Sequence, residues 1–408
     1  MLKQFSYGLI ITLLLSACST GTTPNQQVLS TPEKISPRSS PSNVQVKIES
    51  GTQEGGAQQG ITLNLKYLVS TIAGKAGVSG AVDGNATKAH FNLPQGITID
   101  GRNLYVADLS NHTIRKIEIA TGSVSTIAGL AGKKGSADGK GSAARFNRPF
   151  GITTDGNLLY VTDSNNHSVR QIVINSGKVT TLAGRTGESG RADNVGKDAR
   201  FFIPEGITTD GSHLYIADTH NHAVRMIKIS SGEVTTIAGT SGTPGFLNDV
   251  GIKSQFYFPK GITTDGKNLY VADFGNHLIR KIVLKNGLVS TLAGVAIIEG
   301  ANMDQENYRF NYPSGITSDG RYLYVADTLN RTIRRVSIAS GEVSLVAGKV
   351  DMEGVADGQG LDARFKYPVG IATDGSSLYV TDANSHTIRR VRQPMRFFMS
   401  KITRFFLP

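Results

Sequence analysis

The chain has 408 residues, a formal net charge of +11 and a single Cys. One cysteine excludes an intramolecular disulfide, and the basic balance suits an anionic partner such as lipid or polysaccharide. The length alone favours two or three domains, but the repeats described below assign residues 65–392 to a single one.

The N-terminus has the pattern of a bacterial lipoprotein signal peptide, which we assign to residues 1–17. Lys3 precedes an apolar run from Leu9 to Leu15, and two small residues then precede Cys18. Cleavage would leave Cys18 as the N-terminal residue, available for lipid attachment. The alternative is an ordinary secretory signal in which the cysteine is incidental.

Residues 18–64 predict a disordered tether, because they are rich in Ser, Thr, Pro, Gln and Gly and poor in large apolar side chains. The residue after Cys18 is Ser19 and not Asp. In this the chain resembles lipoproteins that are sorted to the outer membrane of Gram-negative cells. We therefore expect an extracytoplasmic protein of the bacterial cell envelope, held at a membrane through Cys18. In that compartment, and with basic residues spread over all the repeats, we expect no nucleic-acid partner.

A block of 55 residues, once 54, recurs six times in the region 65–392. Each copy begins with Pro-x-Gly-Ile and continues with Asp-Gly, Leu-Tyr-Val/Ile-Ala/Thr-Asp and Ile/Val-Arg. Self-similarity at this period indicates units that bury their apolar faces only against their neighbours. The six anchoring prolines are Pro94, Pro149, Pro204, Pro259, Pro313 and Pro368.

The second copy shows what one unit must be. Short β-branched runs at 151–154, 158–162, 169–174 and 179–183 are separated by Asp-Gly, Asx and Ser-Gly turns, which are typical of hairpins. The unit is therefore an antiparallel meander of four strands, which we call strands a to d. Such a sheet repeated about an axis is a β-propeller blade, whereas helical repeats need a helix that no copy contains.

The two ends of the array predict how the ring closes. Residues 69–74 have the sequence of a strand d without its strands a to c, and the last copy stops after Val391 without a strand d. Pairing the two would hide both sheet edges. The fold class is therefore all-β: a six-bladed propeller in which the N-terminal strand completes the last blade. We expect the propeller to be monomeric.

The positions that recur in every copy are interpreted as structural. Asp and Arg at fixed spacing would suggest metal or acid–base chemistry in one copy, but ligands on six separate loops are too far apart to share one ion. We predict that the Asp caps the turn between strands b and c, and that the Arg pairs with it within or between blades. These residues are Asp108, Asp163, Asp218, Asp273, Asp327, Asp382, Arg115, Arg170, Arg225, Arg280, Arg334 and Arg389.

Two further repeated features lie in the loops between strands d and a. Asp138 is predicted to be the N-cap of a short helical turn. One Phe per loop is predicted to fill the core between neighbouring blades: Phe91, Phe146, Phe201, Phe256, Phe310 and Phe365.

The positions that vary mark the candidate ligand-binding site. Strand a is innermost, so the residue after each proline, and the residue before it, should lie at the mouth of the central channel. A solvent-exposed loop under relaxed constraint would vary in the same way. The candidate ligand-binding residues are Gln95, Arg148, Phe150, Glu205, Phe258, Lys260, Tyr312, Ser314 and Tyr367.

The C-terminal residues 393–408 form a basic and aromatic tail. Such a segment suits a membrane interface or a binding partner. The equally weighted alternative is a segment that packs on the propeller or frays.

The segment from Pro259 to Ile282, with its Leu-Tyr-Val-Ala-Asp-x-x-Asn-His motif, resembles the NHL repeat. That resemblance implies a six-bladed propeller but no single function. NHL propellers include RNA-binding modules of ubiquitin ligases, sensor domains of bacterial kinases and a peptide-amidating lyase. Related propellers include lactonase-like metalloenzymes and antibiotic-cleaving lyases.

The expected function is that of a binding or scaffold module for a protein, peptide or glycan partner, with no catalytic residue, cofactor or metal. The alternative is a propeller-type lyase or lactonase with a metal in the channel. The rim offers only one acid, Glu205, so a metal would need further ligands, which could come from the d–a loops. The fifth of these loops, residues 294–313, departs most from the others and contains Glu299, Asp304 and Glu306.

Overall fold

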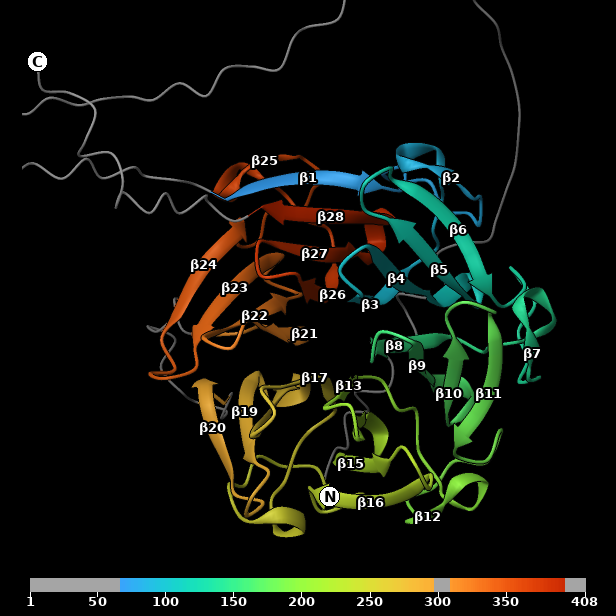
Figure 1. The fold of residues 1–408 in the computed structure, drawn as a ribbon. Helices are drawn as coiled ribbons and strands as arrows, with labels where there is room; N and C mark the ends of the chain where they lie inside the picture. The colour runs from blue at the N-terminus through green and yellow to red at the C-terminus, as the bar shows by residue number, and fades with distance from the viewer. Residues whose placement is uncertain (1–66, 297–308, 393–408) are drawn as a thin grey trace, which may run out of the picture. The chain divides into compact units, whose positions relative to one another are not determined.

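The computed structural model describes residues 67–296 and 309–392 of the protein. These residues form six antiparallel sheets arranged in a ring (Figure 1), which confirms the predicted six-bladed propeller. The signal peptide, the tether, the C-terminal tail and the three acids of the fifth d–a loop lie outside the described residues. No helix in the described part of the chain has the length and hydropathy that a membrane span requires.

Each blade contains strands a to d, counted from the channel outwards. Blade 1 is β3 (Pro94–Ile99), β4 (Asn103–Asp108), β5 (Thr113–Glu118) and β6 (Ser123–Ala128). Blade 2 is β8 (Pro149–Thr154), β9 (Leu158–Asp163), β10 (Ser168–Val173) and β11 (Lys178–Ala183). Blade 3 is β13 (Ile207–Thr209), β14 (His213–Asp218), β15 (Ala223–Lys228) and β16 (Glu233–Ala238).

The remaining blades follow the same plan. Blade 4 is β17 (Pro259–Thr264), β18 (Asn268–Asp273), β19 (Leu278–Val283) and β20 (Val289–Gly294). Blade 5 is β21 (Pro313–Ser318), β22 (Tyr322–Asp327), β23 (Thr332–Ser337) and β24 (Val343–Gly348). Blade 6 is β26 (Pro368–Thr373), β27 (Ser377–Asp382), β28 (Thr387–Arg392) and β1 (Leu68–Ala73).

Four blades have a fifth strand that the sequence analysis did not predict. These two-residue strands lie in the d–a loops and cover the outer edge of strand d: β2 (Gly84–Asn85), β7 (Gly139–Lys140), β12 (Asn194–Val195) and β25 (Gly358–Gln359). They satisfy part of the backbone that an exposed edge strand would leave unpaired.

Short 3₁₀ turns complete the described secondary structure. Five lie in d–a loops: η1 (Ala86–Lys88), η3 (Gly141–Ala143), η5 (Gly196–Asp198), η7 (Gly251–Lys253) and η10 (Gly360–Asp362). Five lie in b–c loops: η2 (Leu109–Asn111), η4 (Ser164–Asn166), η6 (Thr219–Asn221), η8 (Phe274–Asn276) and η11 (Ala383–Ser385).

The ring closes as predicted, through β1. This strand pairs with β28, with Val69 opposite Val391, and on its other side with β25. Asp357, 286 residues further along the chain, accepts hydrogen bonds from the backbone and side chain of Thr71 at 2.9 and 3.1 Å. The closure of the propeller is therefore non-covalent.

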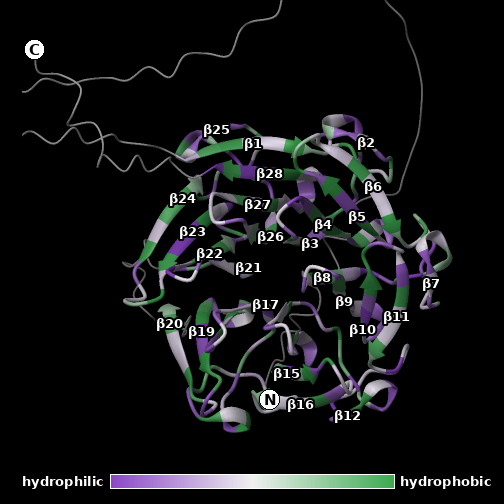
Figure 2. Cartoon of the chain, viewed as in Figure 1, coloured by the Kyte–Doolittle hydropathy of each residue, from purple (hydrophilic) through white to green (hydrophobic). Residues whose placement is uncertain are grey.

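The hydrophobic core lies between neighbouring blades. One cluster, for example, joins Ala73 and Ile388 of blade 6 to Phe91, Ile97 and Leu104 around blade 1. Figure 2 shows hydrophobic residues on all six blades, in keeping with the six separate clusters. The six loop phenylalanines are buried in these clusters, as predicted.

The repeated Asp and Arg pair within one blade. In blade 3, Arg225 Nη1 lies 2.7 Å from Asp218 Oδ2, and both side chains are fully buried. The prediction that the Asp caps the backbone of the b–c turn was wrong, but the Asp does hold that turn, because its Oδ2 accepts a hydrogen bond from Asn221 Nδ2 at 2.7 Å. Its other oxygen accepts a hydrogen bond from Phe202 N in the d–a loop, at 2.8 Å, so the pair joins two loops to one strand.

The prediction for Asp138 was also wrong. The residue that precedes the 3₁₀ turn η3 is Lys140, and it forms no side-chain cap. Asp138 instead binds Arg170 Nη2 at 2.7 Å and the hydroxyl of Thr181 at 3.0 Å. The carboxylate holds the d–a loop against strand d, a contact between residues too distant in sequence for a local pattern to reveal.

Strand a approaches its neighbour through glycine. A Cβ built on Gly206 would lie less than 3.0 Å from the backbone carbonyl oxygen of Lys260 in the next blade, closer than real Cβ contacts. The other five strand-a glycines meet the same obstacle, each from the neighbouring blade: Gly96, Gly151, Gly261, Gly315 and Gly370. The glycine therefore sets how closely the inner strands surround the channel.

We expect Gly206→Ala to destabilise the protein by about 3 kcal/mol, because a backbone carbonyl cannot move aside as a flexible side chain can. Gly211→Ala in the same blade is the matched control: its Cβ meets open space, and its φ of +91° alone should cost about 1 kcal/mol. Urea unfolding of both variants measures the difference. Equal losses would contradict the steric role of Gly206.

Candidate functional site

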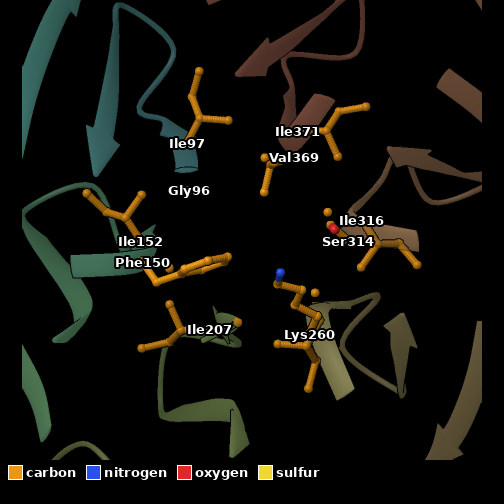
Figure 3. Close-up of a pocket in the computed structure, with 16 residues that line it drawn as sticks. Gly96, Ile97, Phe150, Ile152, Ile207, Lys260, Ser314, Ile316, Val369 and Ile371 are labelled. Atoms are coloured by element: carbon orange, nitrogen blue, oxygen red, sulfur yellow. The ribbon is translucent and has the colours of Figure 1, made fainter. Parts of the chain in front are cut away.

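The central channel is lined by the six inner strands. Gly-Ile pairs from all six blades form its wall, together with Phe150, Lys260, Ser314 and Val369. Figure 3 shows the ring of Phe150 and the amino group of Lys260 directed into the channel. The predicted position of strand a at the axis is therefore correct.

The nine candidate residues differ in exposure and in the hydrogen bonds that they form. Gln95 is 8% exposed and its amide donates to Leu93 O at 3.2 Å. Ser314 is 1% exposed and its hydroxyl accepts from Thr328 at 2.8 Å. Tyr367 is half-buried, and its N–H donates to Asp382. We therefore leave Gln95 and Ser314 out of the contact surface.

Three charged candidates interact with one another. Lys260 Nζ lies 3.5 Å from Glu205 Oε2, and each side chain is 14% exposed. This contact is an ion pair without a hydrogen bond, and Glu205 Oε2 is buried with no hydrogen-bond partner among the described residues. Burial raises the pKa of Glu205 while Lys260 and, to a smaller degree, Arg148 oppose the rise. Burial lowers the pKa of Arg148, against the attraction of Glu205.

Aromatic rings surround this charged group. Lys260 Nζ lies 5.1 Å from the ring centroid of Phe150 and 4.4 Å from that of Phe274 on the b–c loop of its own blade. Phe274 in turn contacts Tyr312, with their centroids 4.8 Å apart. Both distances to Lys260 are within the range of a cation–π attraction.

A second row of rings continues from Phe258. The His220 ring lies 5.1 Å from Phe258 and 5.0 Å from Phe202. Phe202, which the sequence analysis did not single out, is 37% exposed. The channel mouth is therefore not symmetric. The rings and charges of blades 2 to 5 form one sector of it, which we call the aromatic–cationic sector. It consists of Arg148, Phe150, Phe202, Glu205, His220, Phe258, Lys260, Phe274 and Tyr312.

Several bulky residues at this mouth have a left-handed backbone. The φ angles of Arg148, Ile203, Phe258 and Tyr312 lie between 48° and 55°. Side chains with a Cβ, and β-branched ones above all, rarely adopt this conformation, so each site stores strain. The surrounding structure must hold these residues in place.

A histidine of the preceding blade supplies that support. The N–H of Phe258 donates to His222 Nδ1 at 3.1 Å, and the N–H of Tyr312 donates to His277 Nδ1 at 3.1 Å. The same bond, from 3.1 to 3.2 Å, recurs at three more junctions, where His112, His167 and His386 accept from Arg148, Ile203 and Leu93. The histidine ends the Asn-His motif quoted in the sequence analysis, which did not predict its role between blades.

The sixth junction, between blades 5 and 6, shows how the left-handed backbone is related to the histidine. Blade 5 has Arg331 in place of the histidine. Tyr367, which stands where the other blades have the donor, does not have a positive φ angle. Its N–H turns instead to Asp382 at 2.7 Å. The histidine and the left-handed backbone therefore occur together.

We expect His222→Asn to remove a pH dependence. Burial and, to a smaller degree, the neighbouring His220 lower the pKa of His222 to about 4. Protonation of Nδ1 would remove the acceptor of the hydrogen bond from Phe258 N. Stability from this group is complete above its unfolded pKa of 6.5 and is lost as the pH falls towards 4. Asn tolerates the left-handed φ of 55° at this position, and its oxygen can replace Nδ1.

Relative to the variant, the wild type should therefore lose about 2 kcal/mol of unfolding free energy over that pH range, allowing for solvent screening. Urea unfolding of both proteins at several pH values measures this. A difference between the two that stays constant with pH would contradict the role of His222.

No metal-binding cluster is found within residues 67–296 and 309–392: no three His, Cys, Asp or Glu side chains are placed to hold an ion. Glu205, the one acid among the candidate rim residues, forms an ion pair with Lys260. The acids of the fifth d–a loop, to which the metal hypothesis pointed, lie outside these residues.

Repeated blades around a channel with an irregular mouth define the class of protein, a six-bladed β-propeller. The NHL repeat family matches residues 91–117, 146–172 and 256–282. The chain is thus an NHL-repeat propeller protein, as the sequence motifs indicated.

Two known proteins are similar to this chain in sequence. NHL repeat-containing protein 2 of Gallus gallus is 31% identical over 70% of this chain, and its Homo sapiens counterpart is 30% identical over 68%. The chain spans only 44% and 43% of these relatives. They therefore contain further regions that this match does not cover.

Two solved structures share its fold. A Bacteroides thetaiotaomicron structural genomics protein of unknown function has a TM-score of 0.60 and 22% identity, over 80% of this chain and 76% of that one. An auxiliary nutrient binding protein of the same species also has a TM-score of 0.60, with 18% identity over 82% of this chain and 78% of that one. Identities this low establish the fold alone.

Proposed function

We propose that this protein is a lipid-anchored binding module of the bacterial cell envelope, which takes a protein, peptide or glycan partner at the channel mouth. The carrying observation is the aromatic–cationic sector. The framework positions repeat in every blade, whereas the mouth positions differ and gather half-buried rings and charges from four consecutive blades. Concave surfaces with aromatic walls and a few fixed charges suit ligand recognition.

Two further facts support a binding role. Hydrogen bonds between blades join the b–c loops that carry His220 and Phe274 to Phe258 and Tyr312, each of which directly precedes an inner strand. The mouth is therefore held by the framework of the propeller. In addition, a propeller of the same fold is a nutrient binding protein in Bacteroides thetaiotaomicron.

The anchor is tested separately from the binding site. Lipid attachment at Cys18 predicts that the protein sediments with membranes, that it is labelled by radioactive palmitate, and that Cys18→Ser abolishes both. A Cys18→Ser variant that stays in the membrane fraction would contradict the anchor without bearing on the site.

The binding site is tested by partner capture from envelope extract. Alanine at Phe150, Phe258, Tyr312 and Tyr367 together should abolish capture of the partner that the wild type retains. The matched control replaces Val173 and Leu345, exposed apolar residues on the outer strands β10 and β24, by Ala. Capture that survives the first set of changes in a folded protein would refute the proposed site.

A further inference from the structure

The guanidinium of Arg148 forms no hydrogen bond and no ion pair within residues 67–296 and 309–392. Only the backbone N–H of Arg148 is bound, to His112, and the attraction of Glu205 acts from a distance. The residue is nevertheless half-buried. A partly desolvated Arg is usually paired, because the charge loses hydration without compensation.

Arg148 is also held in place at the mouth. Its φ of 55° and the bond from its N–H to His112 belong to the framework that recurs at five junctions, so the backbone at this position is fixed. The half-buried guanidinium without a hydrogen bond is specific to Arg148. It indicates that the guanidinium is positioned for a group that comes from outside the chain.

Lys260 supplies a second cation close by. Its amino group points into the channel in Figure 3. The same group lies 5.1 Å from the ring centroid of Phe150 and 4.4 Å from that of Phe274. Glu205 interacts with Lys260 and, more weakly, with Arg148, which places all three charges in one cluster. Two cations and one carboxylate leave a single positive charge to be matched.

This charge balance selects the class of ligand. A monoanion neutralises the cluster, whereas a dianion such as a phosphate monoester would leave excess negative charge beside Glu205. Arg can donate two parallel hydrogen bonds to a carboxylate, and the rings of Phe258, Phe274 and Tyr312 offer apolar surface in the same sector.

We propose, building on the proposed function, that the aromatic–cationic sector binds the carboxylate of a ligand with an apolar or aromatic body. Arg148 and Lys260 bind the carboxylate, and the rings pack against the body. The C-terminus of a peptide and a free aromatic acid both carry this chemistry.

The test is calorimetric titration of the full-length protein with N-acetylphenylalanine and with its neutral amide. The acid should bind at least about tenfold more tightly than the amide, since a charge-assisted pair is lost with the carboxylate. Phenyl phosphate should bind more weakly than the acid near pH 7. Acetyl-Gly-Gly-Phe and its C-terminal amide show whether a peptide is preferred to the free acid.

Arg148→Gln and Lys260→Met should each weaken binding of the acid by about tenfold and leave binding of the amide almost unchanged. Met keeps an aliphatic chain between the two rings. The matched controls are Arg102→Gln and Lys178→Gln, which remove the same charge from exposed positions on an a–b turn and on an outer strand. They should change the affinity by less than about twofold, because exposed charges at a distance are screened.

Equal binding of acid and amide, tighter binding of phenyl phosphate, or no binding of any probe to the folded protein would overturn the inference. Partner capture that still depends on the four aromatic residues would then show that the proposed function stands without it. Loss of both results would reject the site as a whole.

Discussion

Deletion of residues 66–75 is expected to abolish the cooperative folding of the propeller or to lower its melting temperature by more than about 10 °C. These residues contain β1, which buries Val69 and Ala73 and pairs with both β28 and β25. Without β1, blade 6 would expose a bare edge and part of the core that it shares with blade 1. Circular dichroism on heating measures the effect, and an unchanged melting temperature would contradict this closure.

A milder pair of variants keeps the test open if the deletion fails to fold. Asp357→Ala removes the bonds to Thr71 and Arg389 at the closure, and Asp138→Ala removes the same bonds to Thr181 and Arg170 in blade 2. Each should cost about 1–3 kcal/mol. Only Asp357→Ala should also speed hydrogen exchange throughout β1, because no turn joins β1 to β28 whereas a short turn joins β10 to β11.

Arg225→Met is expected to destabilise the protein by about 3–5 kcal/mol near pH 7, because it leaves Asp218 buried without its counter-charge. Arg225 is fully buried, binds Asp218 and Asp193 and lies over the ring of Phe201. Even in the wild type, burial raises the pKa of Asp218 to about 6, although Arg225 opposes the rise. Urea unfolding measures the loss.

The pH dependence of this variant has a definite sign. A carboxyl whose folded pKa is raised favours the folded state at low pH, when it carries a proton, and loses that contribution as the pH rises through the folded pKa. The gap between Arg225→Met and wild type should therefore shrink from pH 7 to pH 5. Adding Asp218→Asn should recover part of the loss at pH 7. A gap that is independent of pH would show that lost packing, not the orphaned charge, is the cause.

The candidate site was predictable in outline but not in detail. The contrast between repeated and varying positions pointed to Arg148, Phe150, Glu205 and Lys260, which the structure brings together. The same contrast also selected Gln95 and Ser314, whose side chains are buried and hydrogen-bonded within the protein. Variation reveals that a position is free of the repeat, but not whether its polar group is free to meet a ligand.

The bond from histidine to the next blade shows a second limit. His222 lies 36 residues before Phe258, and no short motif links the two. One signal links the histidine to the backbone of the next blade. The copy that has Arg331 in place of His is followed by Tyr367, and among the six residues that precede the repeated prolines only Tyr367 lacks the left-handed backbone. That coincidence becomes visible only when φ angles are known.

The sequence by itself determined the strands, the turns, the number of blades and the strand that closes the ring, because these depend on alternation, turn residues and a repeat period, all of which are local or countable. Only the tertiary structure decided which mouth residues meet and which are buried, and that each repeated histidine supports the following blade. The physical reason is that these contacts join residues about one blade apart, and their geometry depends on how six unequal sets of side chains pack around one axis.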